Sequence, residues 1–171
     1  NFLQEKKPPW ARAVDAWAER RLMAYADRVT FTCRAARDAY AARYPELGAE
    51  KFDFVYNSYD PAQRPTPPVL PDDRPFTMVH FGNCYGERSL GTLIEAMAVL
   101  AREDGLGPAD LRLINCGRFS ADDLDHAASL GVGGHIEVRT AVPHAEGLTL
   151  LAGADLQVLA SYGDRDLFVP A

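Results

Sequence analysis

Two kinds of hydrophobic pattern alternate along this chain. Apolar residues at helical spacing, three or four positions apart, predict helices at 9–26, 34–43, 88–102, 120–130 and 143–152. Short runs of apolar and β-branched residues between them predict strands at 29–32, 52–56, 76–81, 111–116, 136–139 and 155–160. Continuous apolar strands joined by helices are typical of parallel sheets that are covered on both faces. The pattern therefore predicts an α/β fold with a Rossmann-like, doubly wound parallel sheet.

A proline-rich segment interrupts this alternation. Residues 61–75 hold six prolines in fifteen positions and show neither helical nor strand periodicity. Such a segment is extended and semi-rigid, and it packs poorly into a core. We therefore expect residues 1–60 to end one domain, residues 61–75 to be a linker, and residues 76–171 to form a second domain. No helix follows the last predicted strand, so we expect the second domain to be incomplete and the chain to be a piece of a longer protein.

Composition and charge narrow the class of protein. Of the 171 residues, 47% are hydrophobic and 25% are charged, which fits a globular protein and excludes a disordered or fibrous chain. The 18 basic and 24 acidic residues give a formal net charge of -6, which argues against a general nucleic-acid-binding protein. Three cysteines at unrelated positions favour a reducing, cytoplasmic compartment.

The loop after the strand at 76–81 has the features of a phosphate-binding site. Gly82 frees the backbone at the strand end, and the next helix directs its N–H groups and its positive dipole end to the same place. Arg88 at the helix start adds a bidentate donor for phosphate oxygens. These groups predict a diphosphate site that needs no metal ion. The competing interpretation, an ordinary turn beside a solvated arginine, is favoured when the loop is considered alone.

The loop belongs to a longer ordered set of residues. Gly82, Glu87-Arg88, Leu93-Ile94 and Ala96 resemble the opening loop of the donor-binding domain in GT-B glycosyltransferases, and more narrowly in the family 4 (group 1) enzymes. Other segments that resemble this family follow in the family's order, at 26–29, 57–60, 111–117, 136–146 and 150–155. The resemblance extends over nearly the whole chain from Ala26.

The resemblance implies a fold and an activity. The fold would be of the GT-B type, with residues 1–60 as the end of the N-terminal acceptor domain and residues 76–171 as most of the donor-binding domain. The activity would be transfer of a sugar from a nucleoside-diphosphate sugar to a glycan or a lipid-linked acceptor. Enzymes of this family typically need no metal ion, and no other cofactor is expected. Nucleic acid is not an expected partner.

The resemblance also assigns a donor site. Its residues are Gly82, Asn83, Arg88, Gly117, Val142, Asp164 and Asp166. Backbone access is expected from Gly82, charge from Arg88, room for the nucleotide from Gly117, contact with the base from Val142, and contact with the sugar from Asp164 or Asp166. Asn83 departs from the family, which often has arginine there. The second of the family's two acids would fall beyond Ala171, so we expect the chain to be inactive by itself.

A non-catalytic Rossmann-like module of receiver type is the rival function. A receiver needs acidic residues clustered at strand ends and a lysine after a late strand. Here two strand ends carry Gly82 and Gly117, and no lysine follows Lys51. We therefore prefer the glycosyltransferase function. The four histidines share no metal-ligand spacing, and Cys84 has no paired histidine nearby in sequence, so it is interpreted as an incidental thiol.

The first predicted helix carries an apolar stripe of Trp10, Val14 and Trp17. Basic residues surround this stripe at Lys6, Lys7, Arg12, Arg20 and Arg21. A helix of this kind suits peripheral contact with an anionic membrane. Because Asp15 and Glu19 dilute the positive charge, packing against a neighbouring domain is the preferred interpretation, and membrane contact is the alternative.

Overall fold

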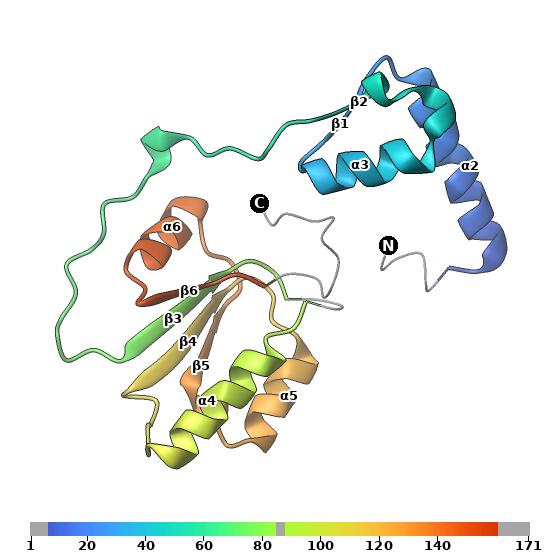
Figure 1. Ribbon diagram of the computed structural model, residues 1–171. Coiled ribbons are helices and arrows are strands. Elements are labelled where there is room, and N and C mark those ends of the chain that lie inside the picture. The colour runs from blue at the N-terminus through green and yellow to red at the C-terminus, as the bar shows by residue number, and fades with distance from the viewer. Residues whose placement is uncertain (1–6, 85–87, 161–171) are drawn as a thin grey trace. The chain divides into compact units, whose positions relative to one another are not determined.

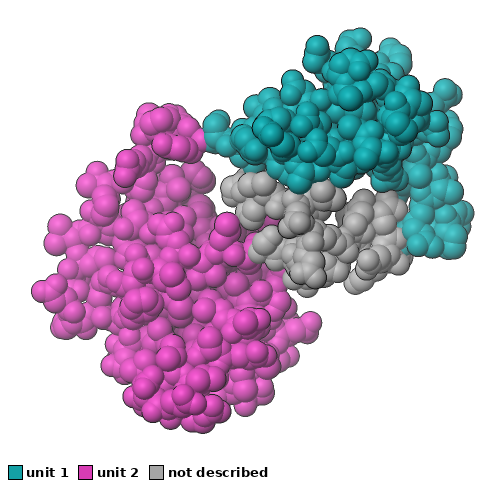
Figure 2. All heavy atoms as spheres, in the orientation of Figure 1, with its two compact units in different colours: residues 1–58, 162–171 teal, residues 59–161 magenta. Residues whose placement is uncertain are grey.

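The chain divides into two compact units (Figure 2). The computed structural model describes residues 7–84 and 88–160. One unit comprises residues 1–58 with 162–171, and the other comprises residues 59–161. The division falls between Ser58 and Tyr59, so the proline-rich segment is grouped with the second unit. Within the described ranges, no helix is both long and apolar enough to cross a lipid bilayer.

The described part of the first unit is a small parallel α/β arrangement. Its elements are helix α2 (Pro9–Tyr25), strand β1 (Val29–Phe31), helix α3 (Arg34–Arg43) and strand β2 (Phe52–Phe54). Strands β1 and β2 pair in parallel, with Val29 opposite Phe52. The Phe31 ring joins helix to sheet, because its centroid lies 4.8 Å from that of Tyr40 on α3 and 6.4 Å from that of Phe52. Aromatic packing of this kind gives a small unit its core.

The second unit contains a four-stranded parallel sheet (Figure 1). Its elements are β3 (Phe76–Phe81), α4 (Gly91–Glu103), β4 (Leu111–Cys116), α5 (Ala121–Ser129), β5 (Ile136–Arg139), α6 (His144–Ala152) and β6 (Leu156–Val158). The strand order is β5-β4-β3-β6, and each pairing is parallel. The predicted α/β fold with a parallel sheet is confirmed, and the arrangement is compatible with a Rossmann-like fold.

Helices cover both faces of this sheet (Figure 1). Helices α4 and α5 pack on one face, where Ile94 and Met97 meet Met78 and Leu113 of the strands. Helix α6 packs on the other face, where Leu150 contacts a cluster that includes Val79 and Ile114 of the strands. Alternate residues of each strand therefore point into two different cores. This two-sided burial explains why β3 and β4 are apolar over most of their length.

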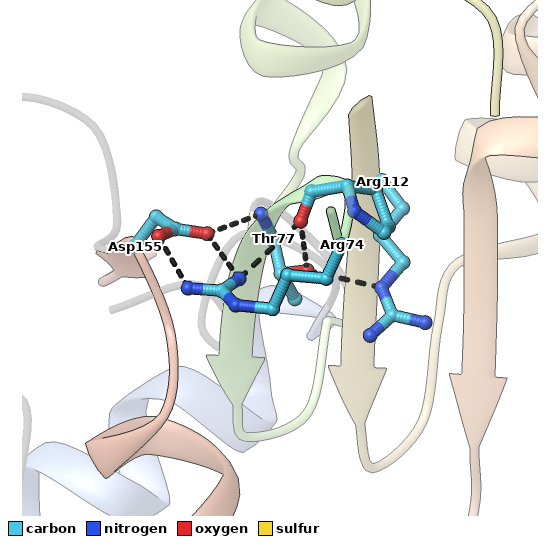
Figure 3. A network of polar contacts seen from close by, with 5 residues as sticks. Arg74, Thr77, Arg112 and Asp155 are labelled. Carbon is cyan, nitrogen blue, oxygen red and sulfur yellow. Dashed lines mark hydrogen bonds and ion pairs between the residues drawn. The ribbon is translucent and has the colours of Figure 1, made fainter. Parts of the chain in front are cut away.

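A polar network ties the proline-rich segment to the sheet (Figure 3). The Arg74 guanidinium donates two hydrogen bonds to the Asp155 carboxylate, at 2.5 and 2.6 Å. Asp155 also accepts from the Thr77 backbone N–H at 2.7 Å, and the Thr77 hydroxyl accepts from Arg112 Nε at 3.0 Å. A single carboxylate thus joins the chain before β3 to the start of β6. Nearby, Pro68 lies so close to Gly153 that a Cβ there would come within 2.9 Å of its ring.

Loss of the Asp155 charge should weaken the second unit in a pH-dependent way. The hydrogen bonds from Arg74 and from the Thr77 N–H lower the pKa of Asp155 below its usual value of 3.8. Its contribution is therefore present above that value and is lost as pH falls through the lower folded-state pKa. We expect Asp155→Asn to lower the melting temperature at neutral pH.

The melting-temperature difference from the wild-type chain should narrow below a pH of about 4. Thermal unfolding followed by circular dichroism across pH measures this difference. Asp125→Asn is the matched control, because Asp125 is exposed on α5 and takes no part in the network. A constant difference from neutral to acid pH would contradict the assigned role.

Candidate functional site

The ends of β3, β4 and β5 are joined at the carboxyl edge of the sheet. Phe81 is opposite Cys116 in the register, so the residues that follow, Gly82 and Gly117, are neighbours. The Gly82 N–H donates to the Cys116 carbonyl at 2.9 Å, and the Gly117 N–H donates to the Arg139 carbonyl at 2.8 Å. Two of the predicted site residues are therefore brought together at the edge where parallel α/β sheets bind ligands.

Gly117 is required by the fold itself. Its φ of 134° lies in a region that favours glycine, and a Cβ at this position would lie 2.2 Å from the Gly82 carbonyl oxygen. At Gly82 the nearest atoms to a Cβ would be those of the His80 ring, 3.3 Å away. The two loops thus approach at a distance that only a glycine at 117 permits. This requirement exists with or without a ligand.

Asn83 fastens the loop after β3 to the loop after β4. Its side-chain Oδ1 accepts a hydrogen bond from the Arg118 N–H at 2.8 Å. The Cys84 N–H donates to the Arg118 carbonyl, also at 2.8 Å. The asparagine that stands where the resembling family often has arginine therefore has a structural partner here. It holds Arg118 at the same edge as Gly82.

A buried aspartate binds the N-terminus of α4. Asp123 of α5 accepts from the Ser89 hydroxyl at 2.6 Å and from the Leu90 N–H at 3.0 Å. The Gly91 N–H donates to Ser89 Oγ at 2.9 Å. The helix consequently begins at Gly91, later than the predicted start at 88, because these contacts hold the preceding residues in a non-helical turn.

The contact of Asp123 with α4 also affects how both helices begin. Ser120, at the start of α5, makes no side-chain capping bond. Asp123 is 6% exposed and is bonded to the N-terminal end of α4. The N–H groups at the start of α4 were predicted to bind phosphate. Two of them are already bonded within the protein, because the Leu90 N–H donates to Asp123 and the Gly91 N–H donates to Ser89. A protein carboxylate occupies part of the positive end of this helix.

Cys84 is a buried, protonated thiol. It is 2% exposed, and burial raises its pKa to about 11, with a smaller opposing effect from the Arg88 charge. The sequence analysis did not pair Cys84 with a histidine. In the structure, however, Cys84 Sγ lies 3.7 Å from His80 Nδ1. The thiol nevertheless stays neutral at physiological pH, so it does not supply the thiolate that nucleophilic catalysis needs.

Two buried polar side chains support the Gly117 peptide. Asn115 Nδ2 donates to the Gly117 carbonyl at 2.9 Å, and Asn115 Oδ1 lies 2.6 Å from His80 Nδ1. Both residues are at most 5% exposed. Sequence analysis did not identify this pair, although two polar residues within apolar strands are the signal that points to it. In the described ranges, no group of three or more His, Cys, Asp or Glu side chains could hold a metal ion.

Two further arginines lie at the carboxyl edge and were not predicted. Arg118 is exposed, and its guanidinium forms no hydrogen bond or ion pair within residues 7–84 and 88–160. Arg139, the last residue of β5, is paired with Glu137 at 2.7 Å and with Glu146 at 3.9 Å. These contacts raise the pKa of Arg139, and the hydrogen bond with Glu137 has the largest effect. Arg118 is therefore the more available charge of the two.

Of the remaining predicted site residues, Arg88 and Val142 are among the residues that the structure describes, and Asp164 and Asp166 are not. Arg88 is partly buried and lies near enough to Cys84 to influence its pKa. Val142 packs with Val79, Ile114 and Cys116 on the α6 face, so the structure gives it an apolar environment. Predicted contacts at Asp164 and Asp166 lie outside the described residues.

Removing the Asp123 side chain should destabilise the second unit. Asp123→Ala would leave the buried Leu90 N–H and the Ser89 hydroxyl without their acceptor, at a cost of about 1.5–3 kcal/mol. Asp122→Ala is the matched control, since Asp122 is exposed in the same first turn of α5 and has the same relation to the helix dipole. Urea unfolding measures both variants. Equal losses would show that the dipole, and not the contact between the helices, is responsible.

Comparison with known proteins does not identify the function of the site. The search finds a match to this chain neither among models of protein families nor among curated proteins. The resemblance to GT-B glycosyltransferases therefore depends on the quoted residues alone. The geometry of the carboxyl edge is the evidence from which a function can be proposed.

Proposed function

We propose that the carboxyl edge of the second sheet binds the diphosphate of a nucleoside-diphosphate sugar, as the donor side of a GT-B-type glycosyltransferase. The observation that carries the proposal is the position of Arg118, an exposed arginine whose backbone N–H is bonded to Asn83 beside Gly82 at this edge. The edge lies where the strand order changes direction, because β3 has β4 on one side and β6 on the other. Ligands of open parallel sheets bind at such a point.

The arrangement supports phosphate binding by side chains more than by backbone N–H groups. The N–H groups of Gly82 and Gly117 are used in bonds between strand ends, and those of Leu90 and Gly91 are bonded to side chains. Arg88 and Arg118 then supply the positive charge that a diphosphate needs. Guanidinium groups suit this task, because their planar donors match phosphate oxygens.

In the proposed reaction the chain stabilises a leaving group. As the bond from the sugar to the diphosphate breaks, negative charge grows on the diphosphate oxygens. Arginine side chains that are already in place stabilise this charge without reorganising at the moment of reaction. The acceptor would be a glycan or a lipid-linked sugar. Asp164 or Asp166 would contact the transferred sugar, and Val142 would lie near the base.

The receiver-type alternative is not favoured by the strand ends. The residues that directly follow β3, β4, β5 and β6 are Gly82, Gly117, Thr140 and Leu159. A receiver needs carboxylates at such positions to bind the phosphoryl-transfer site's cation.

Loss of either arginine should weaken diphosphate binding specifically. We expect Arg88→Ala and Arg118→Ala each to raise the Kd for a nucleoside diphosphate by about 10- to 100-fold, which corresponds to about 1.5–3 kcal/mol for a contact with a charged group. Binding of the bare nucleoside should barely change. Calorimetric titration of the 171-residue chain with UDP, GDP and ADP, and with their nucleosides, measures both effects.

Arg102→Ala is the matched control for these variants. Arg102 is an exposed arginine in the last turn of α4, at the opposite end of the helix from Arg88. Its removal should leave both affinities unchanged, and the melting temperatures of the Arg88 and Arg118 variants should stay near that of the wild-type chain. An equal loss for diphosphate and nucleoside, or the same loss in Arg102→Ala, would contradict the proposal.

A further inference from the structure

Helix α2 of the first unit has an exposed face that carries both tryptophans of the chain. Trp10, Val14, Trp17 and Tyr25 are 71%, 55%, 62% and 91% exposed. Their spacing of four, three and eight residues places them in one line along the helix. No residue of α2 is buried. The helix therefore presents a continuous aromatic stripe to its surroundings, here named the α2 stripe and defined by these four residues.

The opposite side of α2 fastens it to the rest of the first unit. Glu19 accepts hydrogen bonds from the hydroxyls of Tyr40 and Tyr44 and forms an ion pair with Arg43 at 3.4 Å. Glu19 lies nine residues from Trp10, which corresponds to half a turn around the helix. The α2 stripe is thus the face directed away from α3, and the contacts that hold the helix do not use it.

Several charged residues of α2 are neutralised by ion pairs. Asp15 is paired with Lys7 at 2.6 Å, and Arg20 is paired with Glu46 at 2.7 Å. Glu19 is paired with Arg43 on the α3 side of the helix. Arg21 lies between Trp17 and Tyr25 in the same line, with its guanidinium 5.4 Å from the centre of the Trp17 ring. Arg12 is exposed, but it precedes Glu19 by seven residues and therefore lies on the α3 side of the helix. Arg21 is thus a basic residue that lies within the stripe itself.

Charge is also distributed unequally along the chain. Residues 1–58 contain ten basic and eight acidic residues, whereas residues 59–171 contain eight basic and sixteen acidic residues. The net negative charge of the protein thus comes from residues 59–171, and the α2 stripe belongs to residues 1–58, which have a positive balance. Such asymmetry favours an anionic partner for the first half only.

We propose that the α2 stripe binds the interface of an anionic lipid membrane. Tryptophan and tyrosine rings partition to the boundary between headgroups and acyl chains, and arginine reaches from there to lipid phosphates. From Trp10 to Tyr25 the stripe is about 22 Å long and a single side chain wide. A straight, narrow line of this kind fits a plane, whereas protein interfaces concentrate their binding energy in a compact centre. The proposal is independent of the sugar-transfer function.

The two tryptophans allow a direct test with the 171-residue chain. We expect their fluorescence to shift to shorter wavelength, and to become protected from an aqueous quencher, on addition of vesicles that contain phosphatidylglycerol with phosphatidylcholine. Vesicles of phosphatidylcholine alone should have little effect, and added salt should reverse the change because it screens the charge. Absence of any spectral change with the anionic vesicles, or an equal change with both kinds of vesicle, would overturn the proposal.

Variants distinguish membrane binding by the α2 stripe from non-specific adhesion of the protein to vesicles. In vesicle co-sedimentation we expect Trp10→Ala/Trp17→Ala to bind at least about tenfold more weakly than the wild-type chain, since the buried apolar area is lost. Tyr59→Ala is the matched control, because Tyr59 is 79% exposed and lies outside α2. Circular dichroism checks that the double variant folds. Equal binding of the double variant and the wild-type chain would overturn the proposal.

Arg21→Gln should lower the preference for anionic vesicles, and Arg102→Gln should leave it unchanged. Two results without lipid would also overturn the proposal. Quencher-protected tryptophans in a sedimenting dimer would show that a second copy covers the stripe. Protected tryptophans in a monomer would show that another part of the same chain covers it.

Discussion

Parallel pairing of every strand is the constraint from which the second unit's other features follow. Parallel neighbours cannot be joined by a tight turn, so each pair needs a crossover, and the helices α4, α5 and α6 supply it. The crossovers bury both faces of the sheet and collect all carboxyl ends at one edge. The contact of Gly82 with Gly117, the Asn83 link and the proposed ligand site all depend on that edge.

The sequence predicts the elements well because their signals are local. Apolar runs at 76–81 and 111–116 give β3 and β4 with their bounds, and the helix predicted at 34–43 is α3 (Arg34–Arg43). The start of α4 was placed too early, because the carboxylate that determines it belongs to Asp123, more than thirty residues away. Predicted strands at 52–56 and 155–160 are shorter in the structure, at Phe52–Phe54 and Leu156–Val158, since pairing partners set their ends.

The candidate site shows a different limit of sequence reasoning. In a sequence, a glycine that gives a ligand access to the backbone looks the same as a glycine that allows two backbone segments to approach. At Gly117 the close approach of the Gly82 carbonyl is sufficient to require glycine. Arg118 carries no motif of its own and becomes notable only because the Asn83 side chain holds its backbone. The assignment of these residues to a glycosyltransferase donor site stays a prediction, and so do the roles of Asp164 and Asp166.

The strand order also has a consequence for how the second unit is made. Strand β3 is the first of its sheet to be synthesised, yet one of its two neighbours, β6, is the last, some eighty residues later along the chain. Until Leu156–Val158 emerges, one edge of an apolar strand has no partner within its own sheet. Such an edge is a template for pairing with other chains. We therefore expect aggregation to compete with folding until β6 pairs with β3, next to the hydrogen bond that the Thr77 N–H donates to Asp155.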